Sequence, residues 1–254
     1  MIMAQIGYCY GSEYHLMRFL GHHRDLLEER IKKGLNESGI IHWLDFEFDN
    51  PLSSLSGDKE LKGLSFLEKL NLPKDKVQSV ISNYHDYKIN GIDNWQCWDA
   101  VFTLNDTLYL VEAKAHTSEL SSGDDEHGGE SKKEILRFFR EQLEETPEYQ
   151  LSISNIWLKK YYQFANRLAT AAFLNKQGIK TKVLYIYFIN GFDKRVVESQ
   201  KIYRLYEDNA SQKDYEKAII REKQSLSILE KESSVSKLLA APIFIKADSK
   251  DYDD

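Results

Sequence analysis

Two charged side chains whose spacing could support chemistry lie inside an apolar stretch of the sequence. Residues 107–115 (Thr-Leu-Tyr-Leu-Val-Glu-Ala-Lys-Ala) have the composition of a β-strand. Side chains two apart on a strand share a face, so Glu112 and Lys114 should project together while Ala113 points the other way. Burying an acid and an amine at the end of an apolar strand costs free energy unless something pairs them. A partner is therefore expected on the preceding strand.

That preceding strand, expected over residues 95–104, carries a second carboxylate, Asp99. The intervening pair Asn105-Asp106 tolerates positive φ and predicts a tight antiparallel hairpin. Such a hairpin would set Asp99 across from Glu112. Two carboxylates brought together repel each other, and a divalent cation is the usual remedy. The pattern therefore predicts a metal site.

The expected metal is Mg²⁺, with Mn²⁺ as its substitute. Magnesium takes hard oxygen ligands and keeps several waters, so Asp99, Glu112 and the carbonyl of Ala113 would leave room for water and a phosphate oxygen. The metal would polarise the phosphate and lower the pKa of a bound water. Lys114 could orient that water or neutralise the transition state. The three candidate catalytic residues are Asp99, Glu112 and Lys114.

The elements that must position these residues follow one another in a regular order. Apolar spacing and turn signals predict helices at about 13–21, 23–36, 131–145 and 156–176, and strands at 40–48, 95–104, 107–115 and 182–189. The last strand is apolar on both faces, which is typical of a central strand covered by helices.

Asp99, followed after twelve residues by Glu112-Ala113-Lys114, resembles the motif of the PD-(D/E)xK nuclease superfamily. Position 98 is Trp where the motif has Pro. The resemblance covers roughly residues 12–190, and the strings 111–116 and 162–169 are also similar to uncharacterised bacterial nuclease-like proteins. It implies an α/β restriction-endonuclease-like core, a central mixed sheet flanked by helices in the order αβββαβ. It also implies a metal-dependent nuclease that cuts DNA rather than RNA.

The resemblance implies supporting residues as well. Many members place an acid on the first helix as an added ligand, a role open to Glu13 or Glu29, although Glu13 also suits the dipole of its own helix. On the helix at 156–176, Gln163 and Arg167 would hold a phosphate or orient Lys114. They belong to a polar stripe that an ordinary solvated helix face explains equally well. That stripe comprises Lys159, Gln163, Asn166, Arg167 and Thr170.

The remaining segments carry no catalytic interpretation. Residues 58–88 are expected to be an insertion with short helices at 61–70 and 74–84. Residues 117–130, rich in Ser, Gly, Asp and Glu, are expected to form a mobile excursion, and His116 and Glu119 at its start are better explained as loop residues than as neighbours of the metal. Ser131 and Glu134 form a capping box. A charged helix at 212–232 and an edge strand at 242–246 complete the chain.

The composition of the chain limits which classes of function are open to it. The 254 residues, 42% apolar and 12% aromatic, suffice for one domain over 1–254. A net charge of −6 and a pI near 5.7 argue against a protein that coats nucleic acid through a broad basic face. Two cysteines make no disulfide framework, and no signal peptide or membrane span is evident. We expect a cytoplasmic protein with a nucleic-acid partner and no membrane association, and the sequence leaves a homodimer open.

Two rival interpretations stay open. In the first, the same fold binds nucleic acid or a protein partner without cleaving anything. In the second, the protein is an ordinary structural α/β protein in which Glu112 and Lys114 form a cross-strand ion pair. Metal binding separates them from the nuclease.

Overall fold

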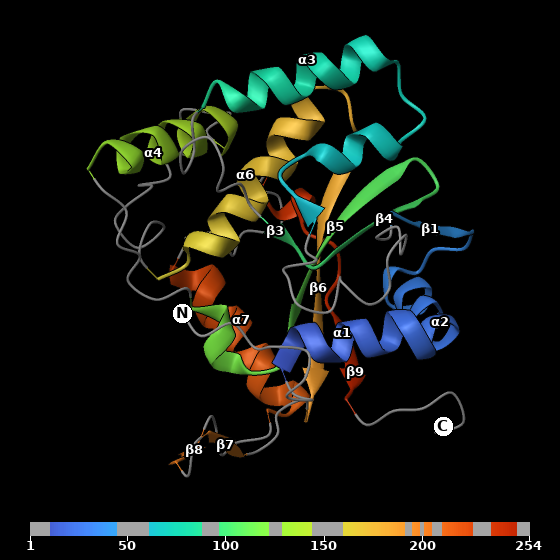
Figure 1. Cartoon of the computed structure of the whole chain (residues 1–254), viewed down its shortest axis with the longest axis vertical. Helices are drawn as coiled ribbons and strands as arrows, with labels where there is room; N and C mark the ends of the chain where they lie inside the picture. Colours follow the sequence, from blue (N-terminus) through green and yellow to red (C-terminus); the bar gives the residue numbers. More distant parts are fainter. Residues whose placement is uncertain are drawn as a thin grey trace.

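The structure, a computed structural model, describes residues 11–44, 61–87, 97–121, 129–143, 160–190, 195–198, 201–204, 210–225 and 235–247. Over these ranges the chain has a mixed α/β fold with one curled five-stranded sheet and six α-helices (Figure 1). The α/β class predicted from the alternation of elements is confirmed. No helix among the described residues is long and apolar enough to cross a membrane.

The sheet has the strand order β1-β4-β5-β6-β9. Strands β1, β4 and β5 form an antiparallel meander, and β6 and β9 add to it in parallel. The predicted hairpin is confirmed, because Leu104 pairs with Thr107 and Asn105 has a φ of 52°. The prediction of a central strand is confirmed by β6 and that of an edge strand by β9. The strands are β1 (Ile41–Trp43), β4 (Ala100–Leu104), β5 (Thr107–Lys114), β6 (Thr181–Ile189) and β9 (Ile243–Lys246).

Two hydrophobic clusters cover the two faces of the sheet. Helices α1 (Gly11–His22) and α2 (Arg24–Leu35) pack on the face that carries Val111, Ala113 and Ile186. Helix α6 (Tyr162–Lys176) packs on the opposite face. Alternation of side chains along β5 therefore sends Glu112 and Lys114 toward α6 rather than toward α1.

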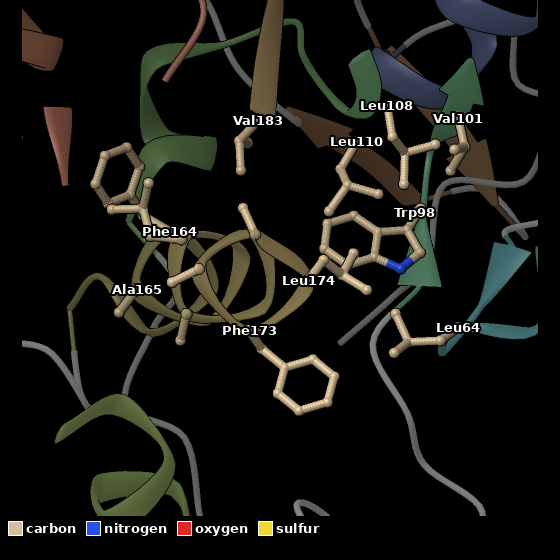
Figure 2. Packing of buried hydrophobic residues seen from close by; sticks show 14 of the residues in the cluster. Leu64, Trp98, Val101, Leu108, Leu110, Phe164, Ala165, Phe173, Leu174 and Val183 are labelled. Carbon is tan, nitrogen blue, oxygen red and sulfur yellow. The ribbon is translucent and has the colours of Figure 1, made fainter. Parts of the chain in front are cut away.

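Helix α6 is itself covered on its outer side. Figure 2 shows Leu110 and Val183 of the sheet on one side of α6 and Phe173 pointing to the other. There the ring of Phe173 lies 5.4 Å from that of Tyr84 on α3 (Lys74–His85) and 6.2 Å from that of Phe138 on α4 (Gly129–Leu143). Helix α6 is thus an inner layer with little contact with water.

Smaller elements complete the described chain. The pair β2–β3 joins the insertion to the segment just before Asp99, and the indole N–H of Trp98 donates to the carbonyl of Gly63 at 2.8 Å. These elements are β2 (Leu61–Lys62), β3 (Cys97–Trp98), β7 (Arg195–Glu198), β8 (Lys201–Arg204), α7 (Gln212–Ser225) and the 3₁₀ turns η3 (Ser65–Lys69), η4 (Thr117–Leu120) and η6 (Ser236–Leu238).

Several predicted boundaries are wrong. The helix expected at 61–70 is instead β2 followed by η3, because pairing with β3 overrides local helix propensity. The first helix begins at Gly11, two residues before its expected start, and α4 begins at Gly129, two residues before the expected capping box. The strand expected at 95–104 is interrupted at Asp99.

Other predictions are met only in part by the described residues. The strand expected at 40–48 is described as β1, with residues 45–48 outside the described ranges, and the loop expected at 117–130 begins as η4, with 122–128 outside them. Residues 151–159 and 226–234 also lie outside, and with them the first part of the helix at 156–176, including Lys159, and the end of the helix at 212–232.

Candidate active site

The hairpin brings Asp99 and Glu112 together as predicted. Asp99 immediately precedes the pair Ala100–Val111, which places it across from Glu112 on the neighbouring strand. The Oδ2 atom of Asp99 accepts a 2.6 Å hydrogen bond from the backbone N–H of Ala113. The carboxylate of Asp99 is therefore anchored to the strand that carries the other two candidate residues.

Glu112 and Lys114 form a buried ion pair. The Nζ atom of Lys114 donates to Oε1 of Glu112 at 2.7 Å and, at 3.4 Å, to Oε1 of Gln163 on α6. Only 3% of Glu112 and 8% of Lys114 are exposed. Burial lowers the pKa of the Lys114 ammonium, but Glu112, Asp99 and Glu119 together raise it above its ordinary value. Lys114 therefore stays charged at neutral pH.

A second cation, Arg167 of α6, holds the other oxygen of Glu112. Its Nε donates to Oε2 of Glu112 at 2.9 Å, and its terminal NH₂ donates to the carbonyl of Cys97 at 2.8 Å. The guanidinium also lies 4.7 Å from the centre of the Trp98 ring. Burial raises the pKa of Glu112, but Arg167 and Lys114 outweigh it and lower the pKa to about 2. Glu112 is thus ionised with both oxygens engaged.

The polar stripe on α6 is not a solvated face, so that alternative is wrong. Asn166 and Thr170 are buried, and they bond to the hydroxyls of Tyr162 at 3.3 Å and Tyr84 at 3.2 Å. The physical reason is the outer layer of α3 and α4, which covers the side of α6 that the sequence pattern assigned to water. Of the stripe, Arg167 and Gln163 contact the candidate residues.

Glu13 and Glu29, the two acids suggested as an added metal ligand, lie in different surroundings. Glu29 is exposed on α2 and lines a surface groove with Lys33 and Asn36 at the end of that helix, so it is not brought to Asp99 and Glu112. Glu13 lies partly buried in the first turn of α1. Its neighbour Ser12 is hydrogen-bonded to Glu119, which places the start of α1 beside the Lys114 end of β5.

His116 and Glu119, which both follow the motif, differ in role. The His116 side chain accepts a hydrogen bond from the N–H of Ser118 at 3.1 Å and caps η4, as its expected loop position predicts. Glu119 accepts from the N–H of Ala115 at 3.4 Å. Burial raises the pKa of Glu119, although Lys114 and Ser12 lower it. Glu119 is therefore a further acid within electrostatic reach of Lys114.

Sequence reasoning missed the contribution of α7. The hydroxyl of Tyr215 donates at 3.3 Å to the carbonyls of Lys114 and Phe188, which ties α7 to the ends of β5 and β6. Two turns later, Glu222 is 2% exposed. Burial raises the pKa of Glu222 to about 8, although Lys114 and Lys223 lower it. The helical spacing of Tyr215, Ile219 and Glu222 is the signal that could have indicated a buried side.

Two tyrosines of β6 lie beside the candidate residues. Tyr185 pairs with Glu112 and Tyr187 with Lys114 in the parallel register. Burial raises the pKa of both phenols well above the ordinary value, and the charge of Glu222 raises it further. The phenol rings beside Lys114 are therefore neutral, and the nearby carboxylates provide the counter-charge of its ammonium.

The described residues contain no group of three or more His, Cys, Asp or Glu side chains placed to hold a metal ion. A metal bound here would rely on two carboxylates and a backbone carbonyl. Comparisons of the chain with protein-family models, with curated proteins and with solved structures found no match.

Proposed function

We propose that this protein is a metal-dependent nuclease of the PD-(D/E)xK type, which hydrolyses phosphodiester bonds of DNA rather than RNA in the cytoplasm. One observation carries the proposal. Asp99 lies across from Glu112 on adjacent strands, with Lys114 on the same face one pleat further along. This is the arrangement that a two-carboxylate metal site with an adjacent cation requires.

The order of elements supports the restriction-endonuclease-like core. A helix precedes the antiparallel meander β1-β4-β5, and helix α6 then crosses over to β6, which is parallel to β5. This is the αβββαβ order that the resemblance implies. Because fold alone does not specify activity, the argument for hydrolysis depends on the site residues.

The donor set suits a hard cation. Asp99, Glu112 and the carbonyl of Ala113 would hold Mg²⁺, or Mn²⁺ in its place, and the bound ion would supply a nucleophilic water and polarise the phosphate. Glu112 fits this role because its pKa of about 2 keeps it ionised at neutral pH. Asp99 fits because its hydrogen bond to Ala113 fixes it beside the same strand.

The other side chains act by charge and position. Lys114, with its raised pKa, neutralises charge that develops on the phosphate, and Gln163 orients the ammonium through its side-chain oxygen. Arg167 is only 7% exposed, donates hydrogen bonds to Glu112 and the Cys97 carbonyl, and lies over the Trp98 ring. It is better suited to hold Glu112 in place than to clamp a substrate phosphate.

A second candidate function rests on the same contacts. Lys114 and Arg167 engage both oxygens of Glu112, so Glu112 is already neutralised without any metal. This observation favours a module on the same fold that binds nucleic acid or a protein partner without cleaving.

A nuclease assay separates the two candidates. Supercoiled, linear and single-stranded DNA, and RNA, are incubated with the protein in Mg²⁺ or Mn²⁺, beside Asp99→Ala and Lys114→Ala. The matched control is Asp106→Ala, since Asp106 is an exposed acid in the turn of the same hairpin. We expect DNA cleavage that falls by about a hundredfold or more in the two site variants and not in the control.

Equal cleavage by the wild type and Lys114→Ala would indicate a contaminant and refute the assignment. If no cleavage is seen, calorimetric titration with Mn²⁺ shows whether the protein binds the metal. Absence of cleavage on every substrate, together with absence of Mn²⁺ heat in the wild type, would favour the binding module.

A further inference from the structure

Trp98 directly precedes Asp99, and the proposed mechanism gives it no role. It stands where the motif has proline, and its side chain is fully buried, with 0% exposed. Figure 2 shows its ring in the same hydrophobic cluster as Leu64 and Leu110. A buried indole has an apolar ring that packs and an N–H that needs an acceptor. In Trp98 these two parts contact different segments of the chain.

The insertion holds the N–H of Trp98. This N–H donates to the carbonyl of Gly63 at 2.8 Å, and Leu61 pairs with Trp98 in the antiparallel register of β2 and β3. Gly63 has a φ of 57°, a backbone conformation that favours glycine. The insertion therefore fixes Trp98 at two places, its backbone and its indole nitrogen.

The ring of Trp98 supports Arg167. The guanidinium carbon of Arg167 lies over the ring, 4.7 Å from its centre, and both side chains are buried, which strengthens a cation–π contact. The residue before Trp98 adds a second contact, because the carbonyl of Cys97 accepts a hydrogen bond from the terminal NH₂ of Arg167 at 2.8 Å. Strand β3 thus contacts the guanidinium twice, while the Nε atom donates to Oε2 of Glu112 at 2.9 Å.

These contacts set the direction from which Arg167 reaches Glu112. An arginine side chain has several rotatable bonds, so its planar fork bonds in one direction only when the plane is held. The Trp98 ring supports one face of that plane, and the Cys97 carbonyl bonds to one end of it. Without the ring, the guanidinium could turn, and the carboxylate of Glu112 would turn with it. A displacement of about 1 Å at a reacting group can lower a rate about a hundredfold.

We propose that Trp98 is a positioning residue that couples the insertion, through Arg167, to the carboxylate of Glu112. The inference rests on the proposed function, in which Glu112 is a site residue. The coupling itself is a property of the chain without metal or substrate. The alternative is that Trp98 only fills the core. Its replacement would then lower stability by the same amount whether or not Arg167 and Glu112 are present.

Double-mutant cycles in urea unfolding of the full chain test the coupling with no need for activity. Trp98→Leu and Glu112→Gln are made singly and together, first in the wild type and then in Arg167→Met. In the wild type, the two substitutions should be non-additive by about tenfold in the equilibrium constant of unfolding. In the Arg167→Met background the non-additivity should fall below about twofold, because the connecting side chain is gone.

Two further variants separate the coupling from core packing. Trp98→Phe keeps an aromatic ring beside the guanidinium, so its non-additivity with Glu112→Gln should be only about threefold. Phe173→Leu is the matched control, because Phe173 is a buried ring of the same cluster and lies on the same helix as Arg167. This control should be additive with Glu112→Gln to within about twofold.

Nuclease kinetics supply a second readout. Trp98→Leu should lower kcat about tenfold and change KM less than about twofold, because Trp98 is buried and acts on Glu112 rather than on the substrate. Phe173→Leu should leave both constants within about twofold of the wild type. A kcat that Trp98→Leu leaves unchanged would overturn the inference.

The cycles distinguish failure of the inference from failure of the proposed function. Additivity of Trp98→Leu and Glu112→Gln in the wild type would overturn the inference and leave the proposed function intact. Equal non-additivity with and without Arg167 would also overturn it, since the effect would then come from a general loss of packing. Non-additivity that depends on Arg167, in a protein that cleaves no substrate, would support the inference and overturn the proposed function. If Trp98→Leu fails to fold, Trp98→Phe repeats the cycle, and its additivity in the wild type would count against the inference.

Discussion

Replacing Glu222 by glutamine should make the stability of the protein less sensitive to alkaline pH. In the folded chain, burial raises the pKa of Glu222 to about 8, whereas its ordinary value is 4.5. Below pH 4.5 the carboxyl group is protonated in both folded and unfolded chains and has no effect. Between the two values only the unfolded chain loses the proton, so the free energy of unfolding falls as pH rises. Above about pH 8, Glu222 is ionised in both chains and the full loss of stability is present.

The size of the effect follows from these two pKa values. At about 1.4 kcal/mol per pH unit, the interval from 4.5 to about 8 corresponds to about 5 kcal/mol. The glutamine of the variant has no proton to lose and keeps a side chain of the same shape. We therefore expect Glu222→Gln to exceed the wild type in stability by about 3 to 5 kcal/mol near pH 9 and by about zero near pH 4.

Urea unfolding of the metal-free protein measures this difference. The wild type, Glu222→Gln and the exposed control Glu216→Gln are compared at several pH values from acid to alkaline. Comparison with the wild type at each pH cancels the other titrating groups. A stability difference that stays constant with pH would refute the reasoning, because Glu222 would then ionise alike in the folded and unfolded chains.

The remaining predictions concern the Glu112 ion pairs. Arg167→Met should lower the free energy of unfolding by about 3 to 5 kcal/mol, because it removes one partner of a buried pair. Arg137→Met, at an exposed position of α4, should change the free energy of unfolding by less than about 1 kcal/mol. Equal effects of the two substitutions in urea unfolding would contradict the buried contact. The pKa of Glu112 is lowered from 4.5 to about 2, so its contribution is present above pH 4.5 and is lost as pH falls through 2. Glu112→Gln should therefore lower the free energy of unfolding by about 3 kcal/mol at neutral pH and by progressively less in acid. A destabilisation that grows as pH falls would contradict the lowered pKa of Glu112.

The chemical part of the site was predictable because it depends on local geometry. A turn at Asn105 joins two strands, pairing across that turn sets Asp99 opposite Glu112, and alternation along β5 puts Lys114 on the same face. Each step involves neighbours in sequence or a single hairpin, so no knowledge of distant packing is needed.

Packing between distant segments decided what surrounds that site. The spacing of Asn166 and Thr170 is typical of a solvated stripe, yet α3 and α4 cover α6, and the periodic pattern of one helix cannot reveal an outer layer. Arg167 reaches Glu112 across 55 positions of the chain.

The sequence by itself determined the hairpin and the residues that it brings together, since strand period and turn chemistry are local properties. Only the tertiary structure decided how those residues are charged and held: Arg167 bonds to Glu112, and α7 brings Tyr215 to the Lys114 carbonyl from 101 positions away. The pKa of a buried acid depends on which cations and which neutral walls surround it. That environment is formed by packing among α6, α7 and the sheet, and no single segment encodes it.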